Sequence, residues 1–519
     1  MKWYWKIAVG LCAIVVLAIL LDIALNAWIK FQLPRIINEK NNSAYAITFQ
    51  DLEVSIWNNS IDAKKIIIVP KAALNDTVNK AGIYAEVESL AVRDFEIWPV
   101  LFSQKIKARS IAVHKPKVTL YKKSDKAINH SRLRESVVAP FEQIVSVTDI
   151  ALHHGDLKII YVKNNKAMLS VQNINLSLDG VVITEDILKR KIPFSFKNYR
   201  FDCDSVYYRM NEFYHIRTKK INATNTALNI HHFEMVPEFS RREFVKKIPK
   251  EKDLFTISAR AIAVRNMNWG FNSDDFFIHT DAIVLNEASA NIYRAKMPPD
   301  DLTKKHLYNK LLRDLEFDLK VDTLKVRNSI LKYEEEKTFE QGPGKLTLGQ
   351  FNLTAINIGS GFKKKKMADL RIKIKCQFMD ASPLDVDWRL NVMDKTDGFH
   401  IKGTILNFDA EKIVPFSKPY MNVSTKGIID EVRFNFSGND KKNYGEFAVE
   451  YDNLKFTVYR KNDRKKKNKV LTFIGNLLVK NDTKEKLKKT QVELERIPEK
   501  SFYNFLWRSI AEGLKKILI

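Results

Sequence analysis

The chain has 519 residues, 45% of them apolar, with only 17 glycines and 15 prolines, a composition that excludes collagen-like, low-complexity and disordered chains. This length suits two or three ordinary domains or one elongated repeat structure. The formal net charge of +25 indicates an anionic partner, and nucleic acid, lipid headgroups and lipopolysaccharide phosphates all qualify. The lack of a recognition-helix, zinc-finger or RNP-like pattern in the sequence argues against nucleic acid.

The N-terminus predicts a membrane anchor. Residues 1–6 carry two lysines, and the apolar run that follows over 7–29 is interrupted only by Asp22 and Asn26. At about 1.5 Å per residue this run spans roughly 35 Å as a helix, enough to cross a bilayer. We interpret it as a retained transmembrane helix, with a cleaved signal peptide as the alternative. The membrane-anchor residues that we single out are Ile7, Leu11, Val15, Leu21 and Trp28.

Apolar and polar residues alternate over most of the remaining chain, which predicts a mainly β protein. The first strands are expected at 45–69 and 83–121, with a bulge or corner around Gln50-Asp51 where the apolar face changes. Later strands are expected at 370–378, 386–392, 400–408, 428–436, 445–459 and 470–479. Breaks in the alternation predict short helices at 132–146, 185–191, 237–248 and 300–316, the last with Asp300 and Asp301 as candidate caps.

An apolar spacing of i, i+2, i+7, i+9 recurs along the chain and predicts repeated β-hairpins. Each copy encloses four residues rich in Asn, Gly, Pro or charge, which suits a tight loop between two short strands. The clear copies are Val54/Ile56/Ile61/Ala63, Ile111/Val113/Val118/Leu120, Ile150/Leu152/Leu157/Ile159, Ile262/Val264/Trp269/Phe271 and Leu324/Val326/Leu331/Tyr333. A degraded copy is Val206/Tyr208/Phe213/His215.

Residues 498–519 predict an amphipathic C-terminal helix. Its apolar face carries Phe502, Phe505, Leu506, Ile510 and Leu514 at helical spacing, opposite a charged face. Such a face either packs on the last strands or lies in a membrane interface or on a partner, and the sequence favours neither use. These residues are candidates for an interfacial helix, with packing on the last strands as the alternative.

Motifs for catalysis and metal binding are missing. The sequence has no G-x-S-x-G elbow, H-E-x-x-H pair or Rossmann glycine pattern, so we expect neither an enzyme nor a cofactor. The pairs His153-His154 and His231-His232 would point to opposite faces of a strand, and we interpret them as surface or turn residues rather than metal ligands. Beyond the anchor, Cys203 and Cys376 form a disulfide or remain isolated thiols.

Four stretches give the chain a family resemblance. They are Leu319-Lys-Val-Asp-Thr-Leu-Lys-Val-Arg-Asn-Ser-Ile-Leu-Lys-Tyr-Glu334, Gly344-Lys-Leu-Thr-Leu-Gly-Gln-Phe-Asn-Leu-Thr-Ala-Ile-Asn-Ile358, Phe95-Glu-Ile-Trp-Pro-Val-Leu101 and Gly445-Glu-Phe-Ala-Val-Glu-Tyr-Asp-Asn-Leu-Lys455. In these stretches the chain resembles the AsmA-like family, which is related to TamB and to the bridge-type lipid transfer proteins of Gram-negative envelopes.

The resemblance implies a transmembrane helix followed by an elongated, twisted antiparallel β-groove with a few short helices. Residues 1–6 would be cytoplasmic, 7–29 would cross the inner membrane, 30–497 would form a periplasmic groove of repeated hairpins, and 498–519 would be the C-terminal helix. The implied role is transport of phospholipids or other anionic lipids, or outer-membrane homeostasis. The alternative is a membrane-tethered assembly factor with outer-membrane protein partners and no lipid transport.

The apolar residues of four repeat copies are our candidates for lining this groove, since one face of each predicted hairpin is apolar. They are Ile111, Val113, Val118, Leu120, Ile150, Leu152, Leu157, Ile159, Ile262, Val264, Trp269, Phe271, Leu324, Val326, Leu331 and Tyr333.

Overall fold

The computed structural model describes residues 45–55, 57–72, 81–96, 106–123, 145–182, 194–460, 463–469, 482–484 and 486–518, with 19–20, 23–24, 27–28, 31 and 187. The chain divides into an N-terminal unit, Met1–Met210 with Thr218–Asn225, and a C-terminal unit, Asn211–Arg217 with Thr226–Ile519. Both are built mainly of β-strands, as the alternation predicts.

In the N-terminal unit the strands pair in the order β1/β2, β3, β4, β5/β6, β7, β8, β9/β10, where a slash marks two segments lying end to end along one neighbour; β12 pairs with β9. Their bounds are β1 Tyr45–Thr48, β2 Asp51–Ser55, β3 Ser60–Pro70, β4 Gly82–Phe95, β5 Ile106–His114, β6 Lys117–Lys122, β7 Val145–Tyr161, β8 Ala167–Asp179, β9 Asn198–Cys203, β10 Ser205–Arg209 and β12 Lys220–Thr224.

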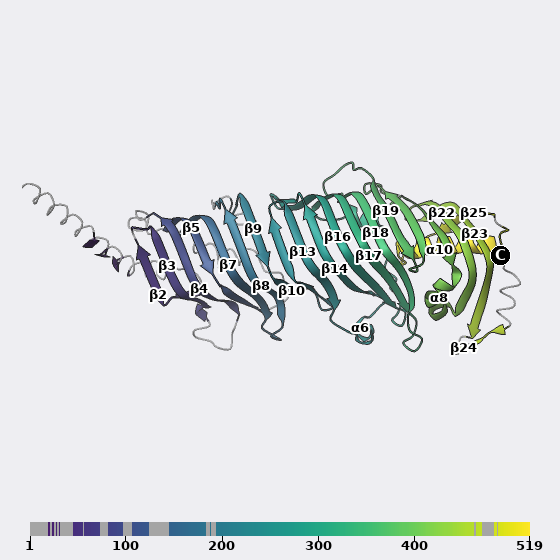
Figure 1. Cartoon of the computed structure of the whole chain (residues 1–519), viewed down its shortest axis with the longest axis horizontal. Helices are drawn as coiled ribbons and strands as arrows, with labels where there is room; N and C mark the ends of the chain where they lie inside the picture. The colour runs from purple at the N-terminus through teal and green to yellow at the C-terminus, as the bar shows by residue number, and fades with distance from the viewer. Residues whose placement is uncertain are drawn as a thin grey trace, which may run out of the picture. The chain divides into compact units, whose positions relative to one another are not determined.

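In the C-terminal unit the order is β11, β13, β14/β15, β16 to β23, then β25, and β24 pairs with β23 (Figure 1). The strands are β11 Tyr214–Thr218, β13 Ala227–Pro237, β14 Asp253–Arg265, β15 Asn268–Asn272, β16 Asp275–Ala295, β17 Asp318–Glu336, β18 Gly344–Gly359, β19 Leu370–Phe378, β20 Ser382–Leu390, β21 Phe399–Asp409, β22 Val423–Gly438, β23 Lys442–Arg460, β24 Asp463–Lys467 and β25 Lys488–Glu495. The helices are α6 Arg241–Lys247, α7 Tyr308–Arg313, η3 Ala410–Ile413, α8 Val414–Met421 and α10 Phe502–Leu518.

The expectation of a purely antiparallel sheet is wrong. β5 and β6 run parallel to β7, and β16 runs parallel to β17. A parallel pair needs a crossover of a dozen or more residues, because the chain must return to the end of the sheet from which it started. The second connection, 296–317, contains the predicted helical break at 300–316. The predicted helix at 132–146 lies outside the described residues except for Val145 and Ser146, which belong to β7.

The hairpin interpretation of the repeats is also wrong, except for the first copy. Val54 pairs with Ile61 across a true β2–β3 hairpin. The copy at 150–159 lies within the single strand β7, and the copy at 324–333 lies within β17. The copies at 111–120 and 262–271 likewise run on in one direction, as β5/β6 along β4 and as β14/β15 along β16.

The spacing arises instead from bulges within long strands. Side chains alternate with period two, so residues seven apart lie on opposite faces unless one extra residue is inserted. In most of these strands the inserted residue has a left-handed backbone, with φ between 45° and 56°. Within the copies these residues are Lys115, His154, Asn266 and Asn328. Left-handed residues of the neighbouring strands lie beside those at 115, 154 and 328, and they are Lys65 and Asn173 in the N-terminal unit and His232, Glu287 and Gln350 in the C-terminal unit.

Within each unit the bulges lie beside one another, and we call each row of bulges a crease. Across the N-terminal crease, the His154 Nδ1 atom lies 2.8 Å from Asn173 Oδ1. Across the C-terminal crease, Arg260 pairs with Glu287 at 2.9 Å, and Asn328 donates its backbone N–H to Asn352 Oδ1. The Asn328 N–H, which the bulge removes from the ladder, thus finds a side-chain acceptor, and the apolar residues on both sides of the crease share one face.

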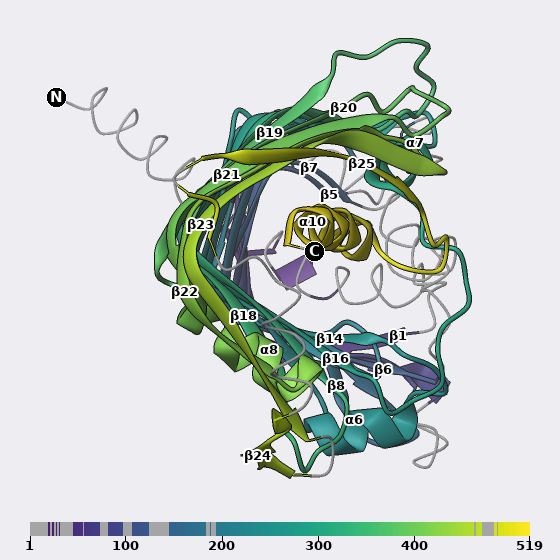
Figure 2. The same cartoon turned by 90° about the vertical axis from the view of Figure 1, so that its right-hand side faces the viewer.

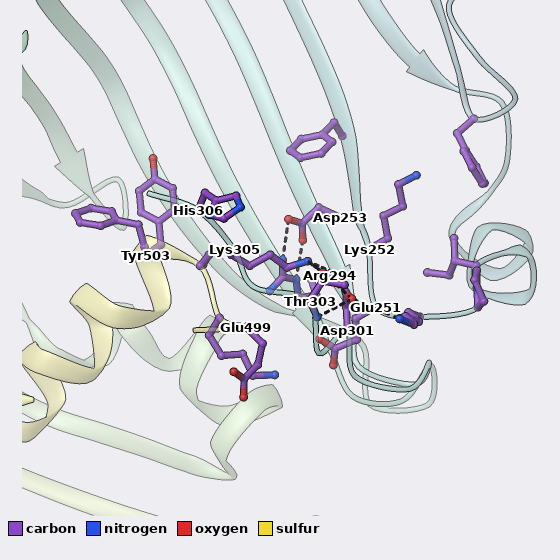
Figure 3. Close-up of a pocket in the computed structure, with 18 of the residues that line it drawn as sticks. Glu251, Lys252, Asp253, Arg294, Asp301, Thr303, Lys305, His306, Glu499 and Tyr503 are labelled. Atoms are coloured by element: carbon purple, nitrogen blue, oxygen red, sulfur yellow. Dashed lines mark hydrogen bonds and ion pairs between the residues drawn. The ribbon is translucent and has the colours of Figure 1, made fainter. Parts of the chain in front are cut away.

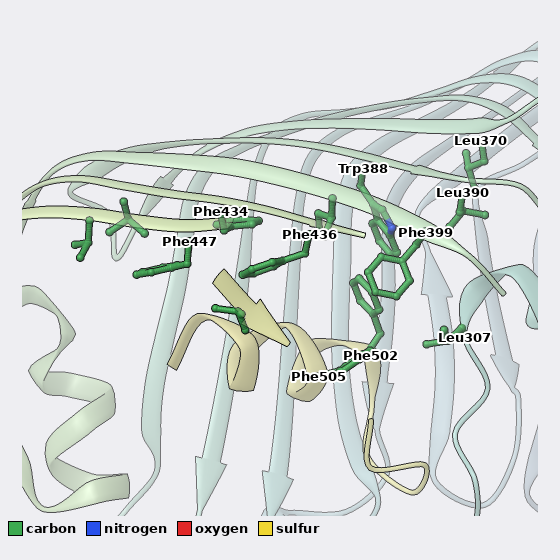
Figure 4. Packing of buried hydrophobic residues seen from close by; sticks show 14 of the residues in the cluster. Leu307, Leu370, Trp388, Leu390, Phe399, Phe434, Phe436, Phe447, Phe502 and Phe505 are labelled. Atoms are coloured by element: carbon green, nitrogen blue, oxygen red, sulfur yellow. The ribbon is translucent and has the colours of Figure 1, made fainter. Parts of the chain in front are cut away.

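The main core of the C-terminal unit forms where α10 packs against the sheet (Figure 4). β18, β21, β22, β23 and β25 curve around the helix, which lies on their concave side (Figure 2). Trp388 stacks on Phe502 with 4.5 Å between ring centroids, while Phe436 and Phe447 are fully buried beside the helix. The concave side is therefore the apolar face of this unit.

Two of the predicted short helices are present in the described residues. α6 starts with a capping box between Ser240 and Glu243 and buries Phe244 against Leu254 and Tyr293. α7 is shorter than expected, and its N-cap is Leu307, so the caps predicted at 300 and 301 are wrong. Asp301 instead bonds Thr303 and Lys305 within the preceding loop. The predicted helix at 185–191, apart from Ile187, and the predicted strand at 470–479 lie outside the described residues.

Candidate functional site

The repeat copies of the N-terminal unit meet side by side. Along the parallel strands β5/β6 and β7, each candidate residue of one copy pairs with its counterpart in the next. Directly paired residues project from the same face, so these pairs form four apolar rows, and every member is partly buried. The pairs are Ile111–Ile150, Val113–Leu152, Val118–Leu157 and Leu120–Ile159.

The copies of the C-terminal unit meet less regularly, because β14 runs antiparallel to β17. Ile262 faces Leu285, which faces Val326, and Val264 reaches Leu324 through Ile283 in the same way. Beyond the crease, Leu331 and Tyr333 lie beside Ala290 and Ile292 of β16. Trp269 and Phe271 do not join them, and pair instead with Ile278 and Phe276 near the other end of β16.

One apolar row runs through most of the C-terminal unit and reaches the residues that pack against α10. Its members, in strand order, are Leu228, Val264, Ile283, Leu324, Ala355, Ile372, Trp388, Ile401 and Phe436. Near α10 the row is closed, with Ile401 2% and Phe436 0% exposed. On β13 and β16, Leu228 and Ile283 are only partly buried. Val264, which lies between them on β14, is 7% exposed, so the row is buried throughout near α10 and only in part towards β13.

The apolar face of α10 packs on the sheet. Phe502 and Phe505 are buried in the main core, and Leu506, Ile510 and Leu514 pack against that core. These contacts correspond to the packing alternative for the C-terminal helix. The helix also carries a buried hydrogen bond, in which Asn443 Nδ2 donates to Ser509 Oγ at 2.6 Å.

A cleft of about 740 Å³ opens in the C-terminal unit beside the start of α10 (Figure 3). Four chain segments far apart in sequence line it, namely 212–214, 247–255, 301–311 and 499–503, together with Arg294 of β16. Its apolar lining comes from Phe213, Phe255, Tyr308, Leu311 and Phe502, and its cations are Lys247, Lys250, Lys252, Arg294, Lys305 and Lys500.

Most cations of the cleft are paired with carboxylates. Arg294 donates two hydrogen bonds to Asp253, at 2.7 and 2.8 Å. Burial disfavours the charged guanidinium, but the bonds and the charge of Asp253 outweigh burial and raise the pKa of Arg294. Lys305 pairs with Asp301, and Lys500 lies 3.5 Å from Asp300. These pairs hold the walls of the cleft together.

The end of β17, next to the cleft, carries three consecutive buried glutamates, Glu334, Glu335 and Glu336. Burial raises the pKa of Glu334, but hydrogen bonds from Arg241 and Asn291 outweigh it and hold that pKa below its ordinary value. Glu335 and Glu336 accept hydrogen bonds from Tyr333 and Tyr293, respectively. Through Arg241 the cluster ties α6 to β17, which is a structural role.

Most of the predicted membrane-anchor residues lie in the part of the chain that the structure does not describe. Of the anchor residues, Ile7, Leu11, Val15 and Leu21 lie outside the described residues, while Trp28 lies in a helical stretch and is 40% exposed. Among the residues that the structure describes, no helix combines the length and the apolar character that a bilayer span requires.

The two described cysteines and the paired histidines have structural positions. Cys203 and Cys376 are both free and buried, which is the isolated-thiol alternative. His153 stacks on His114, whereas His154 and His232 are bulge residues of the creases, and His231 and His232 are exposed. In the described part of the chain, no three His, Cys, Asp or Glu side chains gather in a way that could hold a metal ion.

Comparison with protein-family models gives no match, and no curated protein matches the chain.

The cleft was not anticipated from the sequence. Its lysines lie among many others, and no motif separates Lys247 and Lys252 from the general positive charge. The one local signal is the helical break at 237–248, which predicts α6 and so marks one wall of the cleft.

Proposed function

We propose that the protein holds lipid acyl chains on the apolar face of its sheet and contributes to phospholipid transport or outer-membrane homeostasis. In this proposal the sheet forms a groove in the periplasm, carried by a single N-terminal span of the inner membrane. The location follows from the predicted anchor and the AsmA-like resemblance. The observation that supports lipid holding is the continuous apolar row that is sealed under α10 and only partly buried on β13 and β16.

The free energy gained by holding a lipid depends on the apolar surface that α10 leaves uncovered. Burying a CH₂ group is worth about 0.8 kcal/mol, so an acyl chain of about sixteen carbons could gain on the order of 10 kcal/mol if fully covered. Half of that would hold a lipid against transfer into water. The apolar side of the amphipathic helix α10 already packs on this face, on the concave side of the sheet.

The test compares two adjacent residues of β14. Ile257 pairs with Ala290 and Met235 in a row of the apolar face, whereas the exposed Thr256 points away from that face. Both become aspartate, so the added charge is the same. Full-chain protein is purified, and bound lipid is extracted and counted by mass spectrometry, with circular dichroism as a check of folding.

Ile257→Asp is expected to lose most of the bound lipid, because an ionised carboxylate on the apolar face disfavours an acyl chain. Thr256→Asp should retain the wild-type amount. The proposal fails if folded wild-type protein carries no lipid, or if both variants retain it equally.

The assembly-factor alternative requires an accessible sheet edge for a client strand. Among the described strands, β25 pairs with β23 alone, so it is an edge of this kind. It carries Lys488, Lys489, Glu493 and Glu495, and charges along an edge oppose strand addition. Of the same described strands, β1 and β2 pair with β3 alone and form another edge, and β1 carries no charge, so lipid holding ranks first because of the apolar row and not because of the edges. The alternative predicts that Ile257→Asp leaves client binding intact.

A further inference from the structure

Two lysines of the cleft form cation–π contacts with a pair of aromatic rings. The Lys252 ammonium lies 4.5 Å from the centre of the Phe213 ring, and the Lys247 ammonium lies 4.5 Å from the centre of the Phe239 ring. The two rings meet edge to face, with 6.3 Å between their centroids, and Phe244 of α6 supports Phe213 from another side. The platform, meaning Phe213 and Phe239, thus gathers two positive charges at one end of the cleft.

These two lysines differ from the other cations of the cleft. Arg294, Lys305 and Lys500 each pair with an aspartate, whereas neither Lys247 nor Lys252 forms an ion pair within the described residues. A ring face attracts an ammonium group but does not neutralise its charge. Each ammonium keeps N–H donors for an anion, and a charge-assisted hydrogen bond to an anion is stronger than a neutral one.

Apolar residues of the lining connect the cleft to the apolar face of the sheet. Phe255 lines the cleft and pairs with Ile292, which in turn lies beside Tyr333 of β17. Tyr308 and Phe502 line the cleft near the start of α10, and their rings contact each other. A ligand that filled this volume would have an anionic end at the platform and an apolar end at Phe255.

We infer that the cleft binds the phosphate group of a glycerophospholipid, with Lys247 and Lys252 as its cationic contacts and the acyl chains running past Phe255 onto the sheet. This inference rests on the proposed function and adds a headgroup site to it. Two ammonium groups without ion pairs, placed beside an apolar exit, complement the charge and shape of such a lipid.

The experiment measures equilibrium binding of three probes to the full chain held in amphipol. Dioctanoyl-phosphatidylglycerol carries both the phosphate and the chains, dioctanoylglycerol carries the chains alone, and glycerol phosphate carries the phosphate alone. The test variant is Lys247→Gln with Lys252→Gln. The matched control is Lys246→Gln, because Lys246 is an exposed neighbour on α6 that does not line the cleft.

The double variant is expected to bind the phospholipid about tenfold to a hundredfold more weakly, the range for lost charge-assisted hydrogen bonds, and to bind dioctanoylglycerol unchanged. Lys246→Gln should match the wild type with both lipids, and glycerol phosphate should bind far more weakly than the phospholipid.

Three results would overturn the headgroup site while leaving the groove in place: equal affinity of the wild type for both lipids, equal weakening of both in the double variant, or equal losses in the control. Binding of glycerol phosphate as tight as the phospholipid would reassign the cleft to a free phosphate compound. If neither lipid binds the wild type, the proposed function itself is wrong.

Discussion

Gly513 of α10 tests how closely the helix is fitted to the sheet. A Cβ atom added there would lie 2.4 Å from Cγ of Phe447, a side chain that is fully buried. In an unconstrained helix, Gly→Ala would stabilise by about 1 kcal/mol. Overpacking a tight core costs about 1–3 kcal/mol, and the clash at the base of a buried ring belongs at the upper end of this range. We therefore expect Gly513→Ala to weaken docking of α10 by about 2 kcal/mol.

Hydrogen exchange of α10 peptides, read by mass spectrometry, measures this docking locally. A loss of about 2 kcal/mol corresponds to roughly thirtyfold faster exchange. The reverse substitution at the exposed neighbour, Ala511→Gly, calibrates helix propensity alone and should speed exchange only about fivefold. Slower exchange in Gly513→Ala would show that propensity outweighs the clash, and the account of α10 as a closely fitted helix would then be wrong.

Three further predictions concern the crease, the glutamate cluster and the thiols. Asn328→Val should destabilise the fold by about 1–2 kcal/mol, because a β-branched residue disfavours positive φ, whereas Asn328→Gly should be near neutral in thermal unfolding. Arg241→Ala should cost about 2–3 kcal/mol at pH 7 by leaving Glu334 without its main partner. Burial raises the pKa of Glu334, but the bonds from Arg241 outweigh burial and hold this pKa below its ordinary value of 4.5. The stabilisation is therefore present above pH 4.5 and is lost as the pH falls through the lowered pKa. Urea titrations at several pH values should show a weaker loss of stability in acid for Arg241→Ala than for the wild type. Burial raises the pKa of Cys376 to about 12 and also raises that of Cys203, so maleimide at pH 8 should label both only after unfolding, as peptide mass spectrometry would show.

The positions of strands could be predicted well from the sequence where the alternation is regular. The strand expected at 370–378 is β19, and the bulge expected near Gln50-Asp51 is the break between β1 and β2. Three of the five clear copies, at 111–120, 150–159 and 324–333, contain a crease residue, namely Lys115, His154 and Asn328. The interpretation as hairpins was wrong for all copies except the first. Both a hairpin and a one-residue bulge place residues seven positions apart on the same face of the sheet, so the spacing in a single sequence does not distinguish them.

The cleft shows what the sequence could not supply. Lys252 becomes distinctive only because Phe213 lies under it and because Asp253 and Asp301 are paired with other cations, and these neighbours come from separate segments of the chain. Such proximity is a property of register and packing rather than of local pattern.

Local alternation and apolar content, which depend only on neighbouring residues, determined by themselves that the protein is mainly β, where most strands lie, and that its last helix is amphipathic. The tertiary structure decided which strands run parallel, that α10 covers one end of the apolar face, and that two lysines without ion pairs share a platform, because each of these depends on contacts between residues far apart in the chain.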